Sequence, residues 1–223
     1  MILQTSVGPQ GSKIANNANP AFRAGNQGDG TVSELHGRFY EQNYQGNLFS
    51  NGLTLTALTA NTISLTATTT PILGVWNPAS STVNLVILQA AIELVANNLT
   101  SGAGPGAFVW ASSLSNAVIT TGTAPFNRKT LAQNGSQAKG MSFVALTGLT
   151  NNLVIFEGAD FASPSGLTYT TLASTAIMPG FAAVENFDGN LIVPPGGVLA
   201  LLNTTSCTTF SVAGRMLWEE VPV

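Results

Sequence analysis

The chain of 223 residues has one cysteine, Cys207, and one histidine, His36. A single cysteine excludes an intrachain disulfide, and one cysteine with one histidine provides too few ligands for a zinc site. Cys207 lies in a strand-like run, where we expect it to pack as a small buried apolar residue. A Ser-His-Asp triad would have to use His36, and the sequence has no Gly-x-Ser-x-Gly motif. We therefore predict a non-enzymatic protein with no catalytic residues, no metal and no cofactor.

Charged residues are also scarce. They make up 8% of the chain, whereas an average soluble domain has roughly 25%. The only adjacent basic pair is Arg128–Lys129 and the net charge is −3, so the sequence offers no basic patch for nucleic acid. The surface must instead be covered by Thr, Ser, Asn, Gln and Gly, which are cheaper to bury than ions. This favours a protein that is buried against other chains, and the alternative is a secreted or adhesive β protein with a neutral polar surface.

Long apolar runs are absent as well. The longest, 83–96, is interrupted by Asn84, Gln89 and Glu93. It is also shorter than the roughly 20 residues that a membrane-spanning helix requires. Hydrophobic residues nevertheless make up 44% of the chain, and β-branched residues are common, which is not typical of disordered proteins. We therefore expect a folded protein with no membrane partner.

Residues 1–46 differ from the rest of the chain. The start is rich in Gly, Asn, Pro and Gln and shows no periodicity, so we predict an extended N-terminal arm. Within it, 33–40 could form a helical turn capped by Ser33, or a docking segment. Aromatic and charged residues gather in this region and are our candidates for an interface: Phe22, Arg23, His36, Arg38, Phe39, Tyr40 and Tyr44.

Residues 47–223 show strand patterns. Alternation with period two at 53–56 and 63–66 indicates half-exposed strands. The turn sequence at 77–81 separates two apolar runs and indicates a hairpin, and its second run, 83–95, favours a strand over a helix because it is rich in β-branched residues and lacks caps. Further strands are predicted at 107–110, 117–120, 141–147, 153–157, 176–178, 190–193, 198–203, 209–212 and 215–218.

Turn sequences rich in Gly and Pro separate these runs, at 101–106, 163–166 and 194–197. Many short strands with such turns are typical of a sandwich, a jelly roll or a barrel. The predicted architecture is therefore one all-β domain over 47–223 that follows the arm.

Two pairs of carboxylates are close in sequence, Glu157 with Asp160 and Glu185 with Asp188. A glycosidase needs two carboxylates on either side of a bond, and folding could bring such a pair together. The segment 188–190, Asp-Gly-Asn, resembles a fragment of a calcium loop, but it lacks the other ligands and is more typical of a turn.

Three tryptophans could bind a ligand or stabilise the fold. Trp76, Trp110 and Trp218 could stack on sugar rings, as in carbohydrate-binding modules. Each lies in or beside an apolar run, which favours a role as a core or interface anchor.

Three segments together resemble small β-rich proteins of tailed bacteriophages: 74–88 (GVWNPASSTVNLVIL), 35–49 (LHGRFYEQNYQGNLF), and 193–203 (VPPGGVLALLN) with its closing LWEEVP. The resemblance covers about a third of the chain and implies a virion component: a head decoration or cement protein, a fibre, or a tail or neck protein. It also implies a trimer of jelly-roll-like sandwiches, and it transfers no catalytic residue.

The sequence therefore predicts a structural virion protein, namely an accessory decoration or cement protein on the capsid surface. Its expected partners are two further copies of itself and the major capsid protein or another virion protein. The first alternative is a receptor- or carbohydrate-binding module of a fibre or tail, with a host glycan as ligand. The second is a glycan-cleaving enzyme that uses Glu157, Asp160, Glu185 or Asp188.

Overall fold

The computed structural model describes residues 38–57, 70–96, 102–103, 107–114, 122–142, 149, 151–159, 168–169, 181–204 and 210–223. The chain divides into two compact units, Met1–Tyr40 and Glu41–Val223, and the architecture below is that of the second. The predicted arm over 1–46 stays a prediction, because residues 1–37 lie outside the described part. Cys207 and the strands predicted at 63–66, 117–120 and 176–178 also lie outside the described residues, and their predictions stay predictions.

The described secondary structure is β apart from the six-residue helix α1 (Tyr40–Gln45). Of the helical turn expected at 33–40, only the last three residues are described, and the helix begins at the last of them. The strands are β1 (Leu48–Ala57), β2 (Leu73–Trp76), β3 (Val83–Ala96), β4 (Gly102–Ala103), β5 (Phe108–Leu114), β6 (Phe126–Asn127), β7 (Lys139–Met141), β8 (Val154–Gly158), β9 (Thr168–Tyr169), β10 (Phe181–Val193), β11 (Gly197–Asn203) and β12 (Phe210–Pro222).

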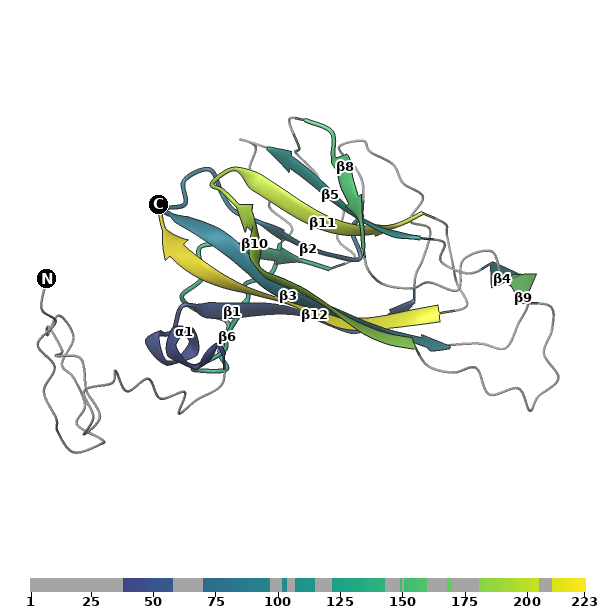
Figure 1. Ribbon diagram of the computed structural model, residues 1–223, viewed down its shortest axis with the longest axis horizontal. Helices are drawn as coiled ribbons and strands as arrows, with labels where there is room; N and C mark the ends of the chain where they lie inside the picture. The colour runs from purple at the N-terminus through teal and green to yellow at the C-terminus, as the bar shows by residue number, and fades with distance from the viewer. Residues whose placement is uncertain are drawn as a thin grey trace, which may run out of the picture. The chain divides into compact units, whose positions relative to one another are not determined.

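The strands form two antiparallel five-stranded sheets, seen as two layers in Figure 1. The first sheet has the order β10-β3-β12-β1-β6 and the second β7-β2-β11-β5-β8, while β4 and β9 pair separately. Without the short strands β6 and β7, each sheet keeps four strands, and most consecutive strands of the chain lie in different sheets. This is the strand arrangement of a jelly roll. The prediction of an all-β, jelly-roll-like β-sandwich is confirmed.

The main core lies between the two sheets. Trp110 of β5 and Trp218 of β12 are both fully buried there, in one cluster with Leu85 and Ile87 of β3 and Phe108 of β5. Burial of each such side chain contributes about 1.5–3 kcal/mol relative to exposure. The inward residues of β3 alternate with outward ones, which is why the apolar run at 83–95 forms a strand as predicted.

The central strand of the second sheet, β11, is buried on both of its faces. All seven residues of β11 are buried. Leu199 and Leu201 belong to the core between the sheets, while Val198, Ala200 and Leu202 belong to a second cluster with Trp76 and Met141 on the other face. A strand that is covered on both faces can be apolar at every position. This explains the unbroken apolar sequence of β11.

The turn between β10 and β11 follows from its Pro-Pro-Gly-Gly sequence. Gly197 N donates to Pro194 O over 2.8 Å, and Gly196 has a φ of 82°. Pro195 thus occupies the second position and glycine the third position of a type II turn, where each is preferred. The predicted turn is confirmed, and it carries the chain from the first sheet to the second.

The turn at 77–81 is also present, but the hairpin predicted around it is wrong. β2 pairs with β11 and β7 in the second sheet, whereas β3 pairs with β10 and β12 in the first. The residue before the proline, Asn77, is fully buried and its Nδ2 donates to Val83 O over 2.8 Å and to Val193 O over 3.0 Å. The chain therefore passes from the second sheet to the first at this turn, because pairing with distant strands decides the partners of β2 and β3.

Two long strands differ from the predicted pattern. β10 begins at Phe181, well before the predicted 190–193, and β12 is one strand of 13 residues where two were predicted. Gly214 lies inside β12 because a Cβ there would approach Ala91 O to 2.5 Å. The glycine marks a close backbone approach and does not end the strand.

The predicted turn at Asp188 and Gly189 is confirmed. Their φ angles are 53° and 85°, in the left-handed region that Asp and Gly tolerate. The register of β10 with β3 changes here: Asn186 pairs with Gln89, and the next pair is Leu191 with Ile87. Residues 187–190 therefore bulge out of the pairing between β10 and β3, and this bulge helps to form the pocket described below.

Candidate interaction surfaces

The structure describes four of the seven residues predicted to form an interface. The other three, Phe22, Arg23 and His36, lie outside the described residues. The guanidinium of Arg38 lies 5.4 Å from the ring centroid of its neighbour Phe39. Tyr40 and Tyr44 are exposed at 41% and 54% of their surface. The role of these residues in an interface stays a prediction.

The three tryptophans are not available for stacking on a sugar. Trp76 is 4% exposed, and Trp110 and Trp218 are fully buried. Trp110 and Trp218 belong to the core between the sheets, and Trp76 belongs to the cluster on the other face of the second sheet. Their interpretation as core anchors is confirmed.

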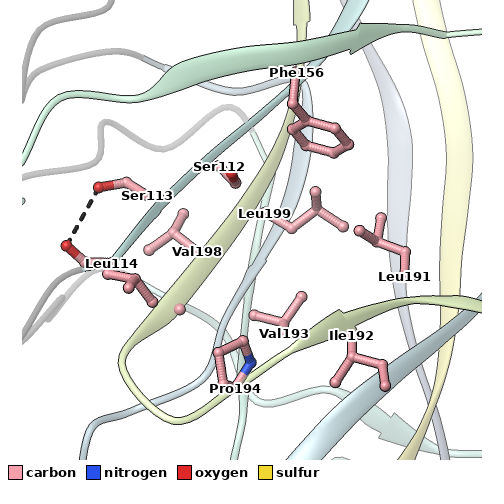
Figure 2. A pocket seen from close by; sticks show the side chains of 11 residues that line it. Ser112, Ser113, Leu114, Phe156, Leu191, Ile192, Val193, Pro194, Val198 and Leu199 are labelled. Atoms are coloured by element: carbon pink, nitrogen blue, oxygen red, sulfur yellow. Dashed lines mark hydrogen bonds between the residues drawn. The ribbon is translucent and has the colours of Figure 1, made fainter.

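An apolar groove lies between the edge strands of the two sheets. β10 is the last strand of the first sheet and β8 the last strand of the second. Figure 2 shows Phe156 of β8 at one end of the groove, with Leu191 and Ile192 of β10 along one side and Val198 of β11 opposite. The volume is about 260 Å³.

Three of the residues that line this groove are exposed apolar side chains: Leu114 (62% exposed), Phe156 (43%) and Ile192 (54%). Two more, Val154 (64%) and Val184 (56%), are exposed on β8 and β10 but do not line the groove. These five residues come from β5, β8 and β10. Isolated exposed apolar residues are ordinary, but a group on one side of a domain is typical of an interaction surface.

A second, polar pocket adjoins the groove and shares Phe156 and Leu191 with it. It has a volume of about 350 Å³, and its lining comes from β8 and β10: Phe156, Glu157, Glu185, Asn186, Phe187, Asn190 and Leu191. We call it the acidic pocket, and the side of the sandwich formed by β8 and β10 the acidic edge. The fold thus brings together Glu157 and Glu185, two of the four carboxylates considered as a catalytic pair.

The carboxylate of Glu185 is fixed by the core. Trp110 Nε1 donates to Glu185 Oε2 over 2.9 Å, and Glu185 is 8% exposed. Phe187 packs edge-on against Trp110, with ring centroids 5.4 Å apart. By contrast, Glu157 is exposed on β8. The pocket therefore has one carboxylate anchored at its base and one that reaches solvent.

Asn186 is also held in place. Its Oδ1 accepts a hydrogen bond from Gln89 Nε2 over 2.8 Å, and Gln89 Oε1 accepts one from Arg215 Nη2 over 2.8 Å. These three residues lie on neighbouring strands of the first sheet, β10, β3 and β12. This chain of side-chain hydrogen bonds orients the amide of Asn186 at the rim of the acidic pocket.

The opposite side of the sandwich is formed by β6 and β7, and we call it the basic edge. Arg128, Lys129 and Lys139 are all exposed there. Phe126 and Leu131 add apolar surface, with exposures of 44% and 74%. Since β6 and β10 are the two ends of the first sheet, the basic and acidic edges face away from each other.

A hydrogen-bonded turn presents the basic residues. Asn127 Oδ1 accepts from Lys129 N over 2.9 Å, and Asn127 Nδ2 donates to Gly46 O over 2.8 Å. Arg128 N donates to Leu48 O over 2.9 Å, which ties the turn to β1. Leu131 is held at a φ of 57°, an uncommon conformation for a bulky residue. This surface is therefore a fixed structure and not a loose loop.

The acidic pocket includes residues that sequence reasoning did not single out for function, namely Phe156, Phe187 and Asn190. The sequence indicates the Asp-Gly turn at 188–189, but only the fold shows that this turn presents Phe187 and Asn190 beside β8. In the sequence, Arg128 and Lys129 stand out only as the sole adjacent basic pair.

Within the described ranges, no three His, Cys, Asp or Glu side chains lie close enough together to hold a metal ion. In the same part of the chain, no helix has the length and apolar character needed to cross a membrane.

No protein-family model, curated protein or solved structure matches this chain.

Proposed function

We propose that this protein is a structural subunit of a bacteriophage particle, a decoration or cement protein that assembles with copies of itself and binds the shell. The support comes from three properties of the chain: the jelly-roll sandwich, the low content of charged residues, and apolar surface at two opposite edges. Jelly rolls occur in viral capsid and lectin domains, among others.

The acidic edge is the observation that carries the assembly proposal. Three large apolar side chains that line the groove of about 260 Å³ beside this edge, Leu114, Phe156 and Ile192, are between 43% and 62% exposed. Covering this surface with another protein removes apolar area from water, and this burial stabilises the contact by about 25 cal/mol per Å² of apolar area. The lining of the groove includes no charged side chain, in keeping with the depletion of charged residues in interface cores.

The two edges offer different surfaces, which supports a head-to-tail contact between copies. A surface that binds a different surface of the next copy makes a head-to-tail contact, and such contacts close into rings when the rotation fits. A trimer is the ring that we propose. In this arrangement the acidic edge of each copy meets the basic edge of its neighbour.

Binding of a glycan or its cleavage is supported less well. The tryptophans that could stack on a sugar are buried. A glycosidase needs both carboxyl groups at the scissile bond, whereas Glu185 is 8% exposed and accepts the indole N–H of Trp110. The pocket is better suited to recognising a group than to catalysis.

Light scattering of the purified full-length chain tests the assembly proposal. We expect a mass three times that of the chain, which is 22.9 kDa. A Phe156→Ser, Ile192→Ser double variant should lower this mass, because both side chains are exposed at the groove. A monomer at all concentrations in the unmodified chain would contradict the proposal.

The virion role has a separate test. Peptide mass spectrometry of purified virus particles should find the chain in a fixed ratio to the major shell protein. If mild washing removes this protein from the particles and leaves the shell intact, the protein lies on the particle surface, as expected for a decoration protein. Absence from the particles would overturn the virion role.

A further inference from the structure

The two edges of the sandwich carry opposite charge. Three of the seven Lys and Arg residues lie on the basic edge, whereas Glu157, Glu185 and Asp188 lie on the acidic edge. Glu220 meets the connection between β6 and β7, but it is buried and its carboxylate accepts from Ser136 Oγ and Gln137 N. In a chain with so few charges, this separation gives a direction to the contact between copies.

The acidic pocket has the groups that recognise a guanidinium. Glu157 and Glu185 supply carboxylates, which form the strongest hydrogen bonds with arginine. Asn186 and Asn190 add amide groups at the rim, and Phe156 and Phe187 supply aromatic rings against which a planar cation can pack. The volume of about 350 Å³ is enough for one arginine side chain and lies at the low end of the roughly 300–1,000 Å³ of small-molecule sites.

Arg128 is the cation best placed to enter such a pocket. It is exposed, its backbone N–H is fixed to Leu48 O, and its guanidinium has no hydrogen-bond or ion-pair partner within the described part of the chain. Lys129, its neighbour, instead lies over the ring of Tyr44, with Nζ 5.2 Å from the centroid. Arg128 is also flanked by Phe126 and Leu131, whose apolar side chains are exposed.

We propose that Arg128 of one copy enters the acidic pocket of the next copy, and that this contact repeats around the ring. The apolar residues beside Arg128 then cover the groove that adjoins the pocket (Figure 2). This inference rests on the proposed assembly and names the two surfaces that form it. Glu185 keeps its bond to Trp110, and Glu157 forms the exposed part of the ion pair.

Charge reversal tests this pairing. Arg128→Glu and Glu157→Arg should each weaken association at least about tenfold, because each places like charges together. The double variant Arg128→Glu, Glu157→Arg should recover most of the loss, since the pair is restored with its polarity reversed. The dissociation constants come from light scattering over a range of concentrations, at low and at physiological salt.

Glu93→Arg is the matched control. Glu93 is an exposed glutamate on β3, the strand next to β10, and it lines neither the groove nor the acidic pocket. Its reversal makes the same change in net charge as Glu157→Arg. We expect it to leave association unchanged. An equal effect of both reversals would overturn the pairing and indicate a response to net charge alone.

The remaining outcomes separate this inference from the assembly proposal. If the unmodified chain forms the ring and Arg128→Glu leaves it intact, the pairing is wrong and the assembly stands. If the double variant stays as weak as the single variants while its unfolding midpoint is unchanged, the pairing is also wrong. A monomeric unmodified chain refutes the assembly and the pairing together.

Discussion

Trp110 and Glu185 are joined by a buried hydrogen bond of 2.9 Å that connects β5 of one sheet to β10 of the other. The bond satisfies an indole N–H that has no access to water, since Trp110 is fully buried. It also fixes the base of the acidic pocket. One contact thus links the stability of the core to the surface proposed for assembly.

Glu185→Ala should destabilise the fold by about 1–3 kcal/mol, because it leaves the buried indole N–H without an acceptor. Glu185→Gln keeps an acceptor oxygen in the same place and should therefore destabilise the fold by less than Glu185→Ala. Urea denaturation followed by tryptophan fluorescence measures both. Equal stability of the alanine variant and the unmodified chain would show that this bond contributes nothing.

Asn77→Ala should also destabilise the fold by about 1–3 kcal/mol or more, because the carbonyls of Val83 and Val193 both lose the donor Nδ2. Asn77→Asp should be worse, since a carboxylate would face two carbonyl oxygens in a buried site. Asn134→Ala, at an exposed loop position, is the control and should change stability by less than about 0.5 kcal/mol. Thermal unfolding by circular dichroism compares the three.

Gly214→Ala should destabilise β12 by about 1–3 kcal/mol, because the new Cβ would lie 2.5 Å from Ala91 O, a backbone atom that cannot move easily. Gly52 offers a matched comparison on β1, since nothing lies within 4 Å of a Cβ placed there. Gly52→Ala should be neutral or stabilise by up to about 1 kcal/mol. Similar midpoints of chemical unfolding for the two variants would contradict this account.

Glu219 gives stability a dependence on pH. Burial raises the pKa of its carboxyl above the usual value, and its register partners Leu48 and Val86 offer it no charge. The folded state therefore binds a proton more tightly than the unfolded state, so this residue's contribution to stability falls as pH rises above the unfolded pKa of about 4.5.

Glu219→Gln removes this dependence. The variant should equal or exceed the unmodified chain in stability at pH 7, by at most about 0.5 kcal/mol, and the difference should vanish near pH 4. Thermal unfolding midpoints across this range measure it. A variant that loses stability at pH 7 relative to pH 4 would show that the carboxylate has a stabilising partner.

The sequence alone was enough for the fold class and for several local elements. Period-two alternation and turn residues predicted an all-β domain, because strand geometry places alternate residues on opposite faces. The turns at 77–81, 188–189 and 194–197 could be located from Asn, Asp, Pro and Gly, whose backbone preferences act within a few residues. The strand at 83–96 and the buried tryptophans were also predicted correctly.

Only the tertiary structure decided which strands pair and which residues share a surface. The run 74–88 has the local signature of a hairpin, yet β2 and β3 join different sheets, because their partners β11 and β12 lie more than a hundred residues along the chain. The acidic pocket depends in the same way on β8 and β10, which are not paired with each other. Local preferences fix turns and faces, but pairing between distant strands depends on the burial of a common core.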